Sequence, residues 1–229
     1  MPETRSNPTL PLLLHIATTV TGLIDAISYL ALGHVFTANM TGNVVLLAFA
    51  VAGAPGLSVT RSLTALVAFF AGAMIGGRVA TRLSEVSRPR WITTALSLES
   101  ALLLVATLAA INFRDSSENV FQSYSIIVLT ALAMGIRNAT VRKMGIPDFT
   151  TTVLTLTITG LAADSTFAGG TSPRWHRRLL AVLLMFFGAA AGTLLLRHSL
   201  LLPLAAATFL SICCVAISMK QRLTSRANN

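Results

Sequence analysis

The residues with the clearest chemical potential lie between positions 22 and 43. An apolar run there carries one carboxylate, Asp25, and breaks at Gly33. A polar turn follows and leads directly back into apolar sequence; its residues are Asn39, Met40, Thr41, Gly42 and Asn43. Polar groups at membrane depth are costly unless protein or water satisfies them. The stretch therefore predicts either a lined cavity or a tightly packed helix junction.

Asp25 is the strongest single candidate, because an intramembrane carboxylate is by default a functional hypothesis. Its functional interpretation is a proton or cation site, or a partner for a substrate amine. The alternative is a buried ion pair, for which Arg137 is the natural candidate. Both interpretations are compatible, since an ion pair that breaks on binding is a switch.

The polar turn offers amides, hydroxyls and free backbone at the start of a helix. A helix N-terminus presents unpaired N–H groups and the positive end of the helix dipole, which suits an anion. The alternative is ordinary capping of the first helical turn by Asn or Thr. A second candidate lining is a run of threonines whose alternative role is hydrogen bonding between helices. It comprises Thr150, Thr151, Thr152, Thr155, Thr157 and Thr159.

Composition identifies the environment of these residues. The chain has 229 residues, of which 54% are hydrophobic and 11% charged, and its mean hydropathy is +0.73. Soluble domains carry about 25% charged residues. The chain is therefore predicted to be an all-α, polytopic membrane protein that is embedded in the lipid bilayer. The net charge of +9 does not indicate nucleic-acid binding, because the basic residues lie in short loops between apolar runs.

Eight apolar segments are expected, at about 11–33, 36–53, 62–81, 91–112, 123–141, 149–168, 179–196 and 199–219. The second and sixth are the richest in hydroxyls, amides and glycine, which favours re-entrant or half-helix segments and six crossings. Eight crossings are the alternative. With six, twelve loop cations lie on the side of the N-terminus: Arg5, Arg82, Arg88, Arg90, Arg142, Lys143, Arg174, Arg177, Arg178, Lys220, Arg222 and Arg226. Only Arg61, Arg114 and Arg197 lie opposite, so both termini are predicted to be cytoplasmic.

An internal repeat supports six crossings within a single membrane domain, 1–229. Gly22-x-x-Asp25-Ala26 parallels Gly135-x-x-Asn138-Ala139, and Phe70-x-Gly72-Ala73-x-x-Gly76 parallels Phe186-x-Gly188-Ala189-x-x-Gly192. The repeats span about 10–112 and 122–219. Three crossings per repeat give the halves opposite orientations, a common plan of secondary transporters with the site at the repeat interface. The glycines of the segments at about 62–81 and 179–196 are expected to permit close helix packing.

Two motifs, GLIDAISYLALGHVFTANMTGN and MGIRNATVRKMGIPDFTTTVLTLTITG, resemble those of the YoaK family. These are small bacterial inner-membrane proteins of unknown function, so the resemblance implies a multi-span protein of the bacterial plasma membrane and supplies no substrate. The matching positions in the first motif are Gly22, Asp25, Ala26, Phe36, Asn39, Thr41, Gly42 and Asn43. In the second they are Gly135, Asn138, Arg142, Thr151, Thr152 and Thr155.

Further polar residues receive structural interpretations. Glu99 is expected to be tied to another helix, and Arg137 to extend its side chain toward the cytoplasmic end of its segment. No Walker loop, HExxH, CxxC or catalytic Ser/His/Asp spacing occurs in the sequence, so no enzyme, metal or cofactor chemistry is predicted.

The favoured hypothesis is a small transporter for a polar or ionic solute, with a site at the midplane where the two polar segments meet. Asp25 and Arg137 would supply charge. Neutral groups would come from Asn39, Thr41, Gly42, Asn43, Asn138, Thr151, Thr152 and Thr155. Six crossings make a small transporter, so a homodimer is expected, or a resemblance to half of a larger carrier. The alternative is a scaffold, sensor or assembly factor that uses the same polar turns only to lock helices.

Overall fold

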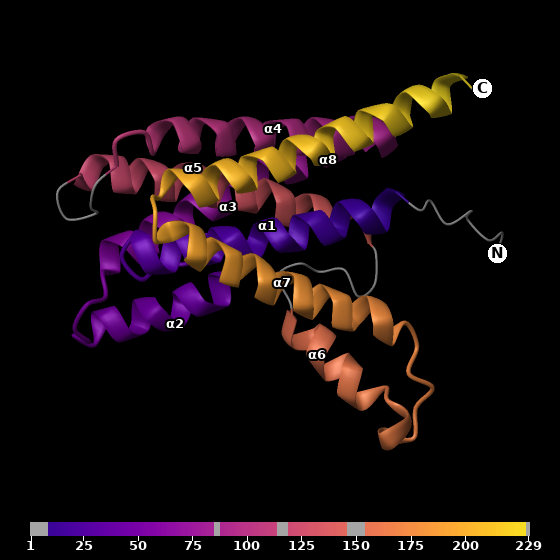
Figure 1. Ribbon diagram of the computed structural model, residues 1–229, viewed down its shortest axis with the longest axis horizontal. Helices are drawn as coiled ribbons and strands as arrows, with labels where there is room; N and C mark the ends of the chain where they lie inside the picture. Colours follow the sequence, from indigo (N-terminus) through magenta and orange to yellow (C-terminus); the bar gives the residue numbers. More distant parts are fainter. Residues whose placement is uncertain (1–8, 85–87, 114–118, 146–153, 228–229) are drawn as a thin grey trace.

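The computed structural model describes residues 9–84, 88–113, 119–145 and 154–227, and within these ranges it is all-α (Figure 1). The α-helices are α1 (Thr9–Ala31), α2 (Met40–Val51), α3 (Val59–Ser84), α4 (Arg88–Ala109), α5 (Val120–Met144), α6 (Leu154–Ala163), α7 (Trp175–Leu196) and α8 (Leu201–Ala227). A short 3₁₀ turn, Thr166–Ala168, follows α6. The predicted fold class, a polytopic α-helical membrane protein, is confirmed.

Six of these helices are long and apolar enough to cross a membrane: α1, α3, α4, α5, α7 and α8. The remaining two, α2 and α6, have 12 and 10 residues. At 1.5 Å per residue α2 is about 18 Å long, well short of the hydrocarbon core of about 30 Å. Within the described residues neither short helix is long enough to span the bilayer, which supports six crossings over the eight-crossing alternative.

Local sequence explains why α2 is a separate half-helix. Helix α1 ends two residues before Gly33, which adopts a φ of +89° that side chains rarely tolerate. The chain then turns back along α1 until Asn39, whose side chain accepts a hydrogen bond from the Gly42 amide at 3.2 Å and begins α2. The start of α2 consequently lies beside the body of α1 rather than at its end.

The long helices alternate in direction along the bundle, and both ends of the chain lie at the same end of the molecule (Figure 1). The two short helices lie toward opposite ends: α2 beside the end where α1 finishes, and α6 beside the end where α7 begins (Figure 1). Each short helix also packs against the long helix that follows it, α2 against α3 and α6 against α7.

Glycines bring helices from the two halves of the chain into close contact. Helix α1 packs chiefly against α7, and α5 chiefly against α3. A Cβ atom on Gly22 of α1 would overlap the Met185 carbonyl oxygen of α7, and one on Gly135 of α5 would overlap the Phe69 carbonyl oxygen of α3. A Cβ atom on Gly72 of α3 would likewise overlap the Leu132 carbonyl oxygen, and one on Gly188 of α7 the Thr19 carbonyl oxygen. The expectation that the glycines of these two segments permit close packing is therefore confirmed.

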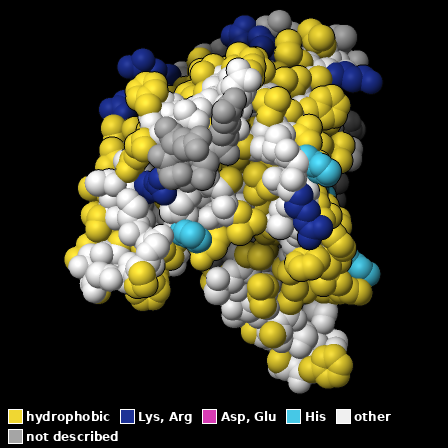
Figure 2. Space-filling view, turned by 60° about the vertical axis from the view of Figure 1, so that its left-hand side comes forward, with side chains coloured by type: hydrophobic (Ala, Val, Ile, Leu, Met, Phe, Trp, Pro, Cys, Tyr) yellow, Lys and Arg dark blue, Asp and Glu magenta, His cyan; other side chains and the backbone are white. Residues whose placement is uncertain are grey.

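The surface matches a lipid environment. Hydrophobic side chains spread over much of the face in Figure 2, with Lys, Arg and His side chains scattered among them. Large apolar side chains are exposed along the bodies of the helices, such as Val67 and Phe70 on α3 and Phe186 on α7. In water such a surface would cause association, whereas hydrocarbon solvates it.

Candidate functional site

A cavity of about 580 Å³ surrounds Asp25 and is lined by four helices and the turn before α2. Of the predicted site residues it contains Asp25, Asn39, Thr41, Gly42 and Thr155. Its other lining residues are Thr21, Tyr29, Phe36, Ala38, Val45, Leu46, Leu154 and Met185. This space, the Asp25 cavity, brings the beginnings of the half-helices α2 and α6 together beside α1 and α7.

Asp25 is 7% exposed, and the backbone rather than a cation satisfies it. Its Oδ1 atom accepts a hydrogen bond from the Ala38 amide at 3.2 Å, and the Asn39 amide is a second partner. Within the described residues, no Lys or Arg forms an ion pair with it. The alternative interpretation of Asp25, an ion pair with Arg137, is therefore wrong, because Arg137 pairs with Glu99.

The polar turn is held by its own side chains. Asn43, which is fully buried, accepts a hydrogen bond from the Phe36 amide at 2.8 Å and donates to the Phe36 carbonyl oxygen. Asn39 caps α2 through Gly42. Capping, the alternative role for Asn39, is thus observed. Asn43 does not line the cavity; its side chain stabilises the turn by hydrogen bonding to the backbone of Phe36.

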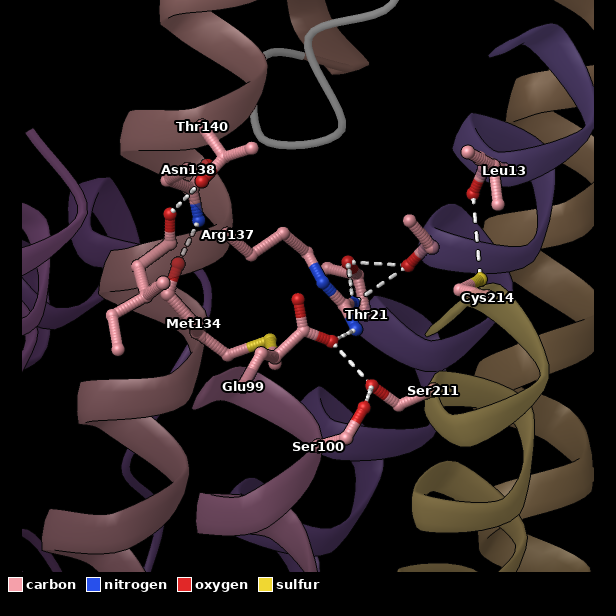
Figure 3. A network of polar contacts seen from close by, with 12 residues as sticks. Leu13, Thr21, Glu99, Ser100, Met134, Arg137, Asn138, Thr140, Ser211 and Cys214 are labelled. Carbon is pink, nitrogen blue, oxygen red and sulfur yellow. Dashed lines mark hydrogen bonds and ion pairs between the residues drawn. The ribbon is translucent and has the colours of Figure 1, made fainter. Parts of the chain in front are cut away.

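Arg137 belongs to a second polar group, the central network, in which α5 meets α1, α4 and α8 (Figure 3). It forms an ion pair with Glu99, and it donates to the Ala17 carbonyl oxygen at 2.8 Å and to Thr21 Oγ1 at 3.3 Å. Ser211 of α8 donates to Glu99 at 2.9 Å. The prediction that Glu99 is tied to another helix is confirmed.

Burial decides the role of Arg137. Arg137 is 3% exposed and Glu99 1%, so the guanidinium is enclosed between helices and the expected extension toward the end of α5 is wrong. Residue 137 lies about 100° around α5 from Asn138. It therefore faces the bundle centre, whereas Asn138 faces a different space.

That space is a second cavity of about 520 Å³, the Arg142 cavity, which also has Asn39 and Thr41 in its wall. Asn138 lines it together with Arg142 and Lys143 of the last turn of α5. The Asn138 side chain donates to the Met134 carbonyl oxygen at 2.8 Å. Asn138 is thus separated from Asp25 by the turn that begins α2.

Two further predicted residues, Thr151 and Thr152, lie outside the described part of the chain. Sequence reasoning did not select Thr21, Tyr29 or Phe36 as lining residues. A signal for the first two exists, because Thr21, Asp25 and Tyr29 are spaced four apart and so share one face of α1. In the described residues, no group of three or more His, Cys, Asp or Glu side chains is placed to hold a metal ion.

Comparison with known proteins shows which family the chain belongs to. A family model described as "Protein of unknown function (DUF1275)" matches residues 13–217. The chain belongs to this family. It is also 38% identical over 152 residues to the UPF0700 transmembrane protein YoaK of Bacillus subtilis (strain 168). That match covers 66% of this chain and 65% of the relative. No solved structure matches the chain.

Proposed function

We propose that this member of the DUF1275 family is a small-solute transporter whose binding site is the Asp25 cavity. The observation that carries the proposal is the cavity itself, where a carboxylate without an ion-pair partner among the described residues meets the beginnings of two half-helices. Polar groups and interrupted helices at membrane depth are tolerated where they line a cavity. Discontinuous helices that meet near the midplane build the sites of many secondary transporters.

Reciprocal packing supports the inverted repeat, which is a common plan of transporters that work by alternating access. Helix α1 relates to α7 and α8 as α5 relates to α3 and α4, while α4 and α8 pack on each other. The glycine contacts at Gly22 and Gly135 correspond in the same way. The proposed orientation has both termini in the cytoplasm, which places Arg142 and Lys143 on the cytoplasmic side and Arg61 opposite. A homodimer remains a prediction.

Water access tests the proposal. In a chain with Cys213 and Cys214 replaced by Ala, single cysteines at Thr41 and Thr155 are probed with a membrane-impermeant thiol reagent, from both sides of the membrane. A transporter site predicts that both react from at least one aqueous side. Ala207→Cys, in the buried core, should stay unreactive, and Ala52→Cys, exposed after α2, should label from the side opposite the termini.

The hydrogen bonding within the turn favours a second candidate, a scaffold that does not transport. Asn39 and Asn43 use their side chains to hold the backbone around α2, which a locked helix junction also requires. Failure of both Thr41→Cys and Thr155→Cys to react from either side would support the scaffold. Labelling of Ala52→Cys from the side of the termini would instead overturn the six-crossing orientation.

A further inference from the structure

The Asp25 cavity and the Arg142 cavity share a wall but differ in charge. Asp25 and Asn138 hold matching positions in the two sequence repeats, and four residues later Tyr29 matches Arg142. Asn39 lies in the wall of both spaces. The first cavity therefore has a carboxylate and an aromatic ring where the second has an amide and a guanidinium.

We propose that the Asp25 cavity binds an organic cation, with its ammonium group at the Asp25 carboxylate and its apolar body against Tyr29 and Phe36. This inference rests on the proposed function, because it names the class of solute that the same site would take. Three properties of the cavity carry it: charge, size and aromatic lining.

Charge is the first property. In the part of the chain that the structure describes, no Lys, Arg or His lines the Asp25 cavity. The beginning of α2 contributes the equivalent of about half a positive charge, and Asp25 already accepts a hydrogen bond from the backbone just before that helix. An ionised carboxylate carries a full negative charge. It outweighs that helix end and makes the nearby space favourable for a cation.

Leu154 and Thr155 of α6 line the same cavity and add no charged side chain to it. Asp25 is the only charged side chain among the described residues that line the cavity. Removing its charge should reverse the preference between a cation and an anion. A variant that only disturbs packing would instead lower the affinities for the cation and the anion together.

Size and lining point to an organic ion rather than a metal ion. A volume of about 580 Å³ falls in the usual range of small-molecule pockets, about 300–1,000 Å³. Apolar side chains such as Leu46 and Met185 line the same cavity as the carboxylate. Tyr29 and Phe36 are stacked with ring centroids 5.0 Å apart, and aromatic faces attract organic ammonium groups.

The test measures binding of three related probes to the purified full chain in lipid nanodiscs by titration calorimetry. Benzyltrimethylammonium, benzyl alcohol and benzoate share a phenyl ring and differ in charge. The cation should bind at least about tenfold more tightly than benzoate. Equal binding of the two ions, or tighter binding of benzoate, would overturn the proposal.

Two variants locate the effect. Asp25→Asn should lower the affinity for benzyltrimethylammonium about tenfold or more and raise that for benzoate. The matched control Asp164→Asn removes a carboxylate that pairs with Arg178 away from the cavity, and it should change neither. Tyr29→Leu, which keeps the carboxylate, should lower the affinity for the cation about two- to fivefold. Unchanged cation affinity in both Asp25→Asn and Tyr29→Leu would also overturn the proposal.

Failure of this inference can be distinguished from failure of the proposed function, because binding is measured without transport. If the cation binds through Asp25 but Thr41→Cys and Thr155→Cys do not react, the cation site is supported and the transporter function is not. If both cysteines react but the protein binds benzoate more tightly, a solute cavity is supported and the proposal of a cation ligand is rejected.

Discussion

Glu99 and Asp25 are both carboxylates within membrane-spanning helices, yet their surroundings differ in kind. Glu99 is enclosed where four helices meet and is neutralised by Arg137. Asp25 meets backbone amides and borders a cavity. The charge of Glu99 is balanced by Arg137 within the protein, whereas Asp25 has no cationic partner among the described residues. The comparison shows that the partner of a buried charge, more than its depth, separates a structural group from a candidate site.

The largest expected effect comes from breaking the ion pair. Arg137→Leu leaves Glu99 buried without its cation and should lower the free energy of unfolding by about 3–5 kcal/mol. Thermal unfolding in detergent, followed by circular dichroism, would report it. Adding Glu99→Leu removes the orphaned charge and should restore much of the loss. A double variant as unstable as Arg137→Leu alone would contradict the structural role assigned to the pair.

A smaller effect should follow from disturbing the wall of the Asp25 cavity. Gly22→Ala places a methyl group against the Met185 backbone, and the displacement of α7 should cost about 1–3 kcal/mol. Helix α7 contributes no side chain to the central network, so the Glu99 ion pair should persist. Gly77→Ala is the matched control because its added methyl group meets open space. Equal destabilisation by both would argue against close packing at Gly22.

Asp25→Asn should cost less, about 1 kcal/mol, because the Asn oxygen can still accept a hydrogen bond from Ala38 without the assistance of the charge. The same unfolding measurement, run beside Glu99→Gln, tests the comparison directly. Glu99→Gln should be the more damaging of the two because it leaves the buried Arg137 charge uncompensated. The reverse order would make Asp25 the structural carboxylate.

The smallest effect is expected at the edge of the central network. Ser211→Ala removes hydrogen bonds to Glu99 and Ser100 at 2.9 and 2.7 Å. Hydrogen bonds between helices in membranes contribute about 0.6 kcal/mol on average, so the unfolding temperature should shift slightly. Cys213→Ala, a matched removal of a polar group on the same helix, serves as the control. A loss comparable to that of Arg137→Leu would show that Ser211 sustains the ion pair.

Much of this arrangement could be predicted from the sequence, for physical reasons. The lengths of the apolar runs determine what can span a bilayer, and the polar turn at Asn39 predicted a half-helix. The partner of Arg137 could not be predicted in the same way. The repeat aligned Asn138 with Asp25 and suggested that its neighbour would reach the same carboxylate. A step of one residue on a helix instead turned Arg137 toward the bundle centre.

Asn43 illustrates a second limit. Its residue type and position fit a lining group and a capping group equally well, and only the path of the chain around Phe36 determines which occurs. Only part of the role of Thr21 could be predicted. Its hydroxyl accepts from Arg137, and the residue also lines the Asp25 cavity. The spacing of Thr21 from Asp25 and Tyr29 indicates the cavity, but no local pattern indicates the contact with Arg137.

The order of synthesis gives the hydrogen bond between Ala38 and Asp25 a further meaning. The principal packing partner of α1 is α7, which begins only at Trp175. At about 5–20 residues per second, α7 begins to be made roughly 7–30 s after α1 is complete. Ala38 follows Asp25 by 13 residues, so its amide is available within the first few seconds. This contact, which is local in sequence, can therefore satisfy the Asp25 carboxylate by hydrogen bonding before α7 has been synthesised.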